Sequence, residues 1–207
     1  MSIHRWIEML VIFLGLPVIL YFTIAELSLW LMPLLGMVGL ICLSLLLVDK
    51  QFKRIRLWKV EGLGEHIIAS VKLFLPWACI VSLFIYLVFP QLFLALPLKD
   101  PGFWAMTLLI YPLVSVIPQE IIFRTYFFHR YKQILPSKQA RWLLSTFFFG
   151  LAHVVYGNWV AVVLSWVGGA VFGYRYMASR STLAVVVEHS IWGSFIFTIG
   201  LGAYFLI

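Results

Sequence analysis

Long apolar runs constrain the fold of this 207-residue chain more than any other feature. A helix that crosses the hydrocarbon core of a bilayer needs about 20 predominantly apolar residues. Seven stretches qualify, at about residues 7–25, 27–48, 67–89, 104–128, 142–156, 159–178 and 182–206. Only 11% of the residues are charged, whereas a soluble domain has roughly 25%. We therefore expect an all-α, polytopic integral membrane protein with about seven transmembrane helices.

The connections between these stretches are too short to form a separate soluble domain. We expect residues 1–207 to form a single membrane-embedded domain, a bundle of helices. Because lipid tails are as apolar as the helix surfaces, such a bundle is held together by close packing and interhelical hydrogen bonds.

Lys and Arg are distributed unevenly over the connections. They accumulate between residues 50 and 59, between 130 and 141, and at 175 and 180, whereas the alternate connections carry only Lys99, next to Asp100. Because positively charged loops remain on the cytoplasmic side, this alternation predicts a cytoplasmic N-terminus. The formal net charge of +7 follows from the same bias and from anionic headgroups. The lipid bilayer is thus an expected partner, and nucleic acid is not.

A few ionisable residues interrupt the apolar stretches. Glu120 and Arg124 lie one helical turn apart in the fourth stretch, His153 lies in the fifth, and His189 follows Glu188 in the seventh. A charged side chain at the bilayer centre costs about 2.5–3.5 kcal/mol on insertion scales, so such residues usually face the bundle interior and mark a functional site.

Three of these residues are expected at a similar depth in the membrane. Counted from the cytoplasmic ends of their helices, Glu120, His153 and His189 lie about eight, eleven and seven residues deep, or roughly 12, 17 and 11 Å. The sequence therefore predicts an intramembrane polar chamber below the cytoplasmic surface, to which three helices contribute.

A carboxylate and two imidazoles in such a chamber suit hydrolysis. Glu120 would take a proton from water, and a histidine would position that water or donate to an oxyanion. Zinc binding by Glu120, His153 and His189 is the competing use, although the two-histidine helical signature of zinc proteases is absent. Glu120 and Arg124 also have a purely structural interpretation, as an ion pair that offsets their insertion cost.

Three short motifs then indicate a family. They are Gln119-Glu120-xxx-Arg124, Phe149-xxx-His153 and Glu188-His189, in this order on successive helices. Together they resemble the CAAX protease and bacteriocin-processing family (CPBP or Abi) of intramembrane proteases, over residues 111–197. The resemblance implies a catalytic core at about residues 104–207. It also implies an endopeptidase, of glutamic or metallo type, that hydrolyses a peptide bond of a membrane-associated or C-terminal-tail substrate.

The resemblance also implies roles for individual residues. Glu120 would activate water with Arg124 as its charge partner, His153 would help to hold that water, and His189 would stabilise the oxyanion. Gln119, Phe149 and Glu188 would support them. The expected partner is a peptide or protein substrate in or at the membrane, reached from the bilayer or its cytoplasmic face. The expected location is a bacterial inner membrane.

Two positions depart from the family pattern. Gln119 stands where the family has a glutamate general base, and an amide does not accept a proton as a carboxylate does. Glu120 or Glu188 must then supply the base, or the protein is inactive. Gly193 stands where an asparagine or similar side chain completes the oxyanion site, so backbone N–H groups or Ser194 would have to substitute.

A second class of function therefore stays open alongside proteolysis. The chain would be a catalytically inactive family member that binds a membrane peptide or lipid, as an immunity protein does, or a small transporter. A transporter is the less favoured of these, because the sequence has no inverted repeat. Replacement of Glu120 by glutamine distinguishes the classes, since it preserves shape and hydrogen bonding and removes the base.

Overall fold

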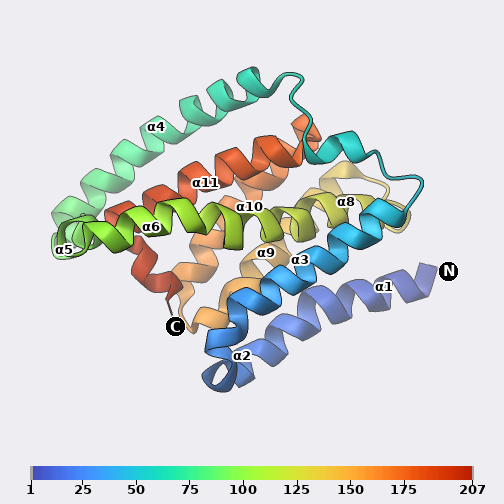
Figure 1. Ribbon diagram of the computed structural model, residues 1–207, viewed down its shortest axis with the longest axis horizontal. Helices are drawn as coiled ribbons and strands as arrows, with labels where there is room; N and C mark the ends of the chain where they lie inside the picture. The colour runs from blue at the N-terminus through green and yellow to red at the C-terminus, as the bar shows by residue number, and fades with distance from the viewer. Residues whose placement is uncertain (1, 207) are drawn as a thin grey trace.

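The computed structural model describes residues 2–206, and within this range all regular structure is helical (Figure 1). The α-helices are α1 Ser2–Leu10, α2 Leu16–Leu27, α3 Leu31–Val48, α4 Leu63–Val88, α5 Ala95–Lys99, α6 Pro101–Tyr111, α7 Ile117–Glu120, α8 Phe127–Arg130, α9 Lys138–Ala152, α10 Trp159–Ser179 and α11 Thr182–Ile199. The predicted all-α membrane bundle is confirmed.

Five helical stretches among the described residues are long and apolar enough to cross a membrane: Ile3–Val48, Leu63–Val88, Pro101–Arg130, Trp159–Ser179 and Thr182–Ile199. The first covers two expected spans, because the chain reverses direction at the 3₁₀ segment Ser28–Trp30 before α3 (Figure 1). The fifth expected span corresponds to α9. With 15 residues, α9 is shorter than the roughly 20 that a full crossing needs, and it packs along α10.

The last helix ends earlier than the sequence predicts, at Ile199 and not near residue 206. Gly200 has a φ of 98°, and a Cβ at this position would lie 1.9 Å from the carbonyl oxygen of Leu92. Glycine alone fits both the left-handed conformation and this close approach. The chain then continues as the 3₁₀ helix Leu201–Phe205. The centroid of the Phe205 ring lies 5.9 Å from that of the His153 ring.

One continuous helix, Pro101–Arg130, is called the central helix below; it comprises α6, α7, α8 and two π-helical segments. These segments are Pro112–Val116 and Ile121–Tyr126, on either side of α7. Pro112 and Pro118 lack the N–H that would bond to the preceding turn, and the chain responds by widening its turns. Turns of this kind recur at functional sites, and here they flank Glu120.

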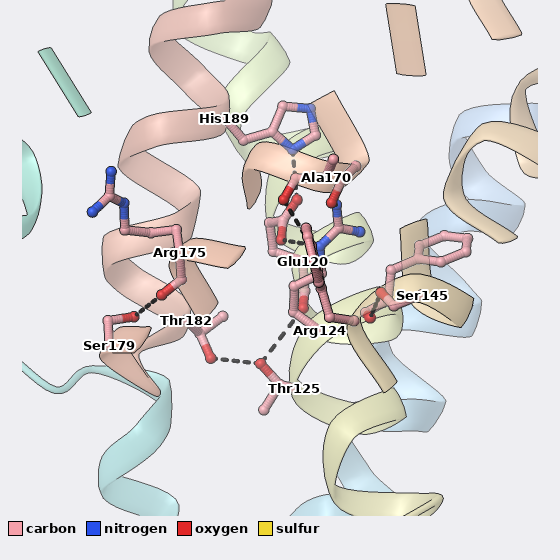
Figure 2. Close-up of polar contacts among 12 residues, drawn as sticks. Glu120, Arg124, Thr125, Ser145, Ala170, Arg175, Ser179, Thr182 and His189 are labelled. Atoms are coloured by element: carbon pink, nitrogen blue, oxygen red, sulfur yellow. Dashed lines mark hydrogen bonds and ion pairs between the residues drawn. The ribbon is translucent and has the colours of Figure 1, made fainter. Parts of the chain in front are cut away.

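Small residues and buried hydroxyls hold the neighbouring helices close to the central helix. A Cβ at Gly39 of α3 would lie 2.9 Å from the Cβ of Pro118, so glycine permits the contact. Ser145 of α9 donates a hydrogen bond to the carbonyl of Phe123 at 2.6 Å, and the hydroxyls of Thr125 and Thr182 lie 2.6 Å apart (Figure 2). These contacts fix the register of α9 and α11 against the central helix.

The Lys- and Arg-rich connections meet at one end of the bundle. His129 at the end of the central helix lies 2.8 Å from the Asp49 carboxylate, and the Ser181 hydroxyl donates to the carbonyl of Lys59 at 2.8 Å. The α5 helix lies at the opposite end (Figure 1). The grouping of the basic connections at one end agrees with the alternation seen in the sequence.

Candidate active site

Glu120 lies at the centre of the bundle and has no exposed surface. Its Oε1 is 2.7 Å from Nδ1 of His189 on α11, and its Oε2 is 3.3 Å from Nε of Arg124, one turn along the same helix. Figure 2 shows the carboxylate between these two partners. The structure thus brings together three residues that the sequence singled out.

The contact with Glu120 determines how His189 is protonated. A carboxylate only accepts hydrogen bonds, so Nδ1 carries the proton and Nε2 of the neutral imidazole carries a lone pair. Nε2 lies 3.1 Å from the hydroxyl of Tyr111, which therefore donates to it. The imidazole also stacks on the Phe172 ring, with centroids 4.2 Å apart and planes 21° apart. Both ring nitrogens and one face of His189 are thus held in place.

Arg124 is fully buried, and aromatic rings surround its charge. Its guanidinium carbon lies 4.3 Å from the centroid of the Phe149 ring and 5.9 Å from that of Phe172. Its Nη2 donates weakly, at 3.5 Å, to the carbonyl of Gly169. The cation is stabilised by the ring faces and by the charge of Glu120, which explains how it is accommodated in the bundle interior.

His153 follows α9 and approaches the same region from another direction. Its Nδ1 donates to the carbonyl of Phe149 at 2.7 Å, which leaves Nε2 as an acceptor. The Phe149 ring lies 4.8 Å from the His153 ring and 5.7 Å from the His189 ring. Phe149, predicted as a supporting residue, thus contacts both imidazoles and the Arg124 guanidinium.

A cavity of about 970 Å³ adjoins these residues, with Tyr111, Gln119, His153 and His189 on its wall. Glu120 does not line it, because His189 stands between the carboxylate and the cavity. The cavity continues past α6 to α5. It therefore extends away from the Lys- and Arg-rich connections, a direction that the sequence did not specify.

Gln119 lies at the junction of two cavities, since it also lines a second one of about 220 Å³ between α2, α3 and the central helix. Its Nε2 donates to the Ser115 hydroxyl at 2.7 Å. Its Oε1 is buried and has no hydrogen-bond partner among the described residues. This amide oxygen is therefore free to accept a hydrogen bond from a water molecule or a substrate N–H.

Glu188 forms a buried ion pair with Arg175, apart from the contacts of Glu120. Its two carboxylate oxygens accept from Nε and Nη2 of Arg175, at 3.0 Å each, and the pair is buried. Glu188 lines neither cavity, so it is not positioned to act on a substrate there. Ser194, expected as one substitute donor for an oxyanion, does not line the cavity either.

Two cavity residues were missed by the sequence analysis, Tyr111 and Ser115. The pattern that would have found them is their spacing. Tyr111, Ser115 and Gln119 recur every four residues, which places three polar side chains on one face of an otherwise apolar helix. Tyr111 then reaches His189 on α11, a contact that no spacing along one helix predicts.

Zinc binding by Glu120, His153 and His189 was expected only as a competing use of these residues. The described residues contain no group of three or more His, Cys, Asp and Glu side chains arranged to hold a metal ion. The Glu120 carboxylate is instead shared by the imidazole N–H of His189 and the Arg124 guanidinium. A second cation at this carboxylate would be repelled by Arg124. The chemistry below therefore uses the side chains alone.

Comparison with known proteins identifies the region that contains this site. A family model described as Rce1-like, "Type II CAAX prenyl endopeptidase Rce1-like", matches residues 101–195, slightly less than half of the chain. No curated protein and no solved structure matches the chain. The matched segment begins at α6 and ends in α11, so it contains Glu120, His153 and His189. The chain is therefore an integral membrane protein whose residues 101–195 are similar to the Rce1-like family of type II CAAX prenyl endopeptidases.

Proposed function

We propose that the protein is a glutamate-dependent intramembrane endopeptidase that hydrolyses a peptide bond of a membrane-associated or C-terminal-tail substrate. The observation that carries this proposal is the buried contact of 2.7 Å between Glu120 and Nδ1 of His189, whose other edge faces a cavity of about 970 Å³. A carboxylate that orients an imidazole at the wall of a cavity is an arrangement suited to general-base catalysis. The match of residues 101–195 to an endopeptidase family model supports the same reaction.

The reaction begins with a water molecule bound at Nε2 of His189. Nε2 takes a proton from the water as the water oxygen forms a bond to the scissile carbonyl carbon. Glu120 stabilises the resulting imidazolium through Nδ1–H and does not itself take the proton. When the C–N bond breaks, the imidazolium returns its proton to the leaving nitrogen, and an amine and a carboxylic acid result. Glu120 thus acts through His189, whereas the sequence suggested direct contact with water.

Gln119 and His153 supply two further acceptors on the cavity wall. Oε1 of Gln119 has no partner among the described residues, and Nε2 of His153 is the unprotonated edge of its ring. An attacking water has two hydrogens, and His189 takes one of them. An acceptor for the second hydrogen orients the oxygen toward the carbonyl carbon. We assign this orienting role to Gln119 and His153.

The shape and lining of the cavity support delivery of the substrate from the bilayer. Trp77 of α4 and Met106 and Ile110 of α6 line the cavity and are also about half exposed on the outer surface of the bundle. Apolar side chains that border both a cavity and the lipid form a lateral entrance suited to an apolar segment or a lipid-modified peptide. The polar groups of the site lie at the inner end of this route.

Replacement of either histidine by alanine tests the proposal. In proteoliposomes, with quenched fluorescent peptides that carry an S-farnesyl cysteine or a transmembrane anchor, His189→Ala and His153→Ala should each lower kcat by about 10²-fold or more. His66→Ala, at the start of α4 and away from the cavity, should cleave like the wild type. Protein yield and thermal unfolding should be the same in all three. Undiminished cleavage in both site variants would exclude hydrolysis by this site.

We also propose that the N-terminus is cytoplasmic in a bacterial inner membrane, because the basic connections gather at one end of the bundle. In a protein with Cys42 and Cys79 replaced by serine, a membrane-impermeant maleimide added to intact bacterial cells should label Lys99→Cys. It should not label Lys53→Cys until the cells are opened. Both positions are exposed. The reverse labelling pattern would invert the topology.

The non-catalytic alternative has one observation in its favour, the amide of Gln119 at the position where the family has a glutamate. In that case the cavity binds a membrane peptide or lipid without cleaving it. The two functions predict opposite results for Glu120→Gln, which is the first variant considered in the Discussion.

A further inference from the structure

Because Gly193 has no side chain, Tyr111 can occupy the position that it has in the structure. Gly193 lies one turn after His189 on α11. A Cβ at Gly193 would lie 2.2 Å from the Tyr111 hydroxyl oxygen and 2.4 Å from Cε1 of its ring, far inside van der Waals contact. Any side chain at position 193 would therefore displace Tyr111. The glycine is what lets this tyrosine cross from the central helix to His189.

Contacts with His189 and Phe197 hold the Tyr111 side chain in place. It lies 3.1 Å from Nε2 of His189, and the Tyr111 ring packs edge-on against Phe197 with centroids 5.2 Å apart. Because Nδ1 of His189 donates to Glu120, Nε2 is an acceptor and the hydroxyl is the donor. The hydroxyl hydrogen thus points to Nε2 of His189, the atom that binds the attacking water in the mechanism above.

Binding of that water releases the hydroxyl from Nε2. The hydroxyl proton is then available to a nearby acceptor, such as the oxygen of the carbonyl that the water attacks. Of the other donors on this wall, the Gln119 amide donates to Ser115 and Nδ1–H of His153 donates to the carbonyl of Phe149, whereas Nε1–H of Trp192 has no partner among the described residues. The Tyr111 hydroxyl is the donor that lies 3.1 Å from Nε2 of His189, the atom that takes a proton from the attacking water in the proposed mechanism.

We propose that the Tyr111 hydroxyl donates a hydrogen bond to the oxyanion of the tetrahedral intermediate, from the space that Gly193 leaves open. This inference rests on the proposed endopeptidase function. The phenol keeps its proton throughout, so its contribution is the electrostatic stabilisation of a charge that exists only in the intermediate and its transition states. Tyr111 would thus replace the side-chain donor that the sequence lacks at position 193.

Removal of the hydroxyl alone is the first test. With the peptides described above, Tyr111→Phe should lower kcat by about 10²–10³-fold, the loss typical of one oxyanion donor, with KM changed less than about threefold. A peptide aldehyde of the same sequence, whose hydrate is tetrahedral, should bind more weakly by a similar factor. The reduced-amide analogue should bind equally well. The matched control is Tyr174→Phe, on the exposed face of α10, which should behave as wild type.

A rescue experiment tests the link with Gly193. Gly193→Asn in the wild-type background should lose activity, because the new side chain collides with Tyr111. Tyr111→Ala should lose activity because the donor is gone. In the double variant, Tyr111→Ala leaves space for the asparagine side chain at position 193. The asparagine amide then provides a donor one turn after His189. The double variant should recover at least about tenfold in kcat over Tyr111→Ala.

The outcomes separate this role from the proposed function. Full kcat and full aldehyde affinity in Tyr111→Phe, while His189→Ala is inactive, would overturn the role of Tyr111 alone. A lower kcat with unchanged aldehyde affinity would also overturn it, because that result indicates positioning of His189 and not oxyanion binding. Cleavage by His189→Ala at the wild-type rate would overturn the function on which the role depends.

Discussion

Glu120→Gln is expected to lower kcat by about 10³–10⁴-fold, the range seen when the carboxylate behind a catalytic imidazole is replaced by its amide. Glutamine matches the shape of glutamate, but it carries no charge to stabilise the imidazolium of His189. Its amide group also permits the imidazole to adopt the other tautomer, with the proton on Nε2. The measurement is single-turnover cleavage by protein reconstituted in liposomes, with KM determined in parallel.

Glu188→Gln provides the matched control for this change. Glu188 is as buried as Glu120 and is also paired with an arginine, but it contacts Arg175 and lies away from the cavity. This variant should be less stable than the wild type and should have the same kcat per folded molecule. If Glu120→Gln instead keeps its biological function and its peptide binding, the protein acts by binding and the endopeptidase proposal is excluded.

Arg124→Met is expected to lower the free energy of unfolding by about 3–5 kcal/mol, the typical cost of removing one partner of a buried ion pair. The substitution leaves the Glu120 carboxylate without its cation in the bundle interior. It also removes the guanidinium from the face of the Phe149 ring, 4.3 Å away. Thermal and denaturant unfolding of the detergent-solubilised protein measure the loss.

Two further variants distinguish the possible causes of this destabilisation. Glu120→Gln combined with Arg124→Met removes both charges, so the double variant should be more stable than Arg124→Met alone. Arg124→Lys keeps the charge and loses the planar group that stacks on Phe149, so its stability should fall between that of the wild type and that of Arg124→Met. Equal stability of Arg124→Met and the wild type would mean that the pair does not stabilise the bundle.

Much of the fold was predictable because hydrophobic spans are a local property. The apolar stretches predicted the helices, and the positions of Lys and Arg predicted which connections share one end. The errors came from tertiary effects. Gly200 ends the last helix early because the Leu92 carbonyl approaches it, and α9 is short because it packs along α10 and does not need to meet lipid over a full crossing.

The candidate site was predictable in part for a related reason. Charge is costly in an apolar helix, so Glu120, Arg124, His153 and His189 stood out without any structure. The contact between Glu120 and His189 agrees with their similar expected depth. The structure pairs Glu188 with Arg175 of α10 and not with Arg124. That pairing depends on how α10 and α11 are rotated about their axes, which the sequence alone does not specify.

The sequence by itself determined that this chain is a membrane-embedded helical bundle with a few ionisable residues in its apolar helices, because apolar length and the cost of buried charge are properties of each helix. The tertiary structure decided which atoms meet. It set Glu120 behind His189, turned Nε2 toward the cavity, and brought Tyr111 into the space beside Gly193. These contacts join residues 69 to 82 positions apart, and they depend on helix rotation and close packing, which arise only when the helices assemble.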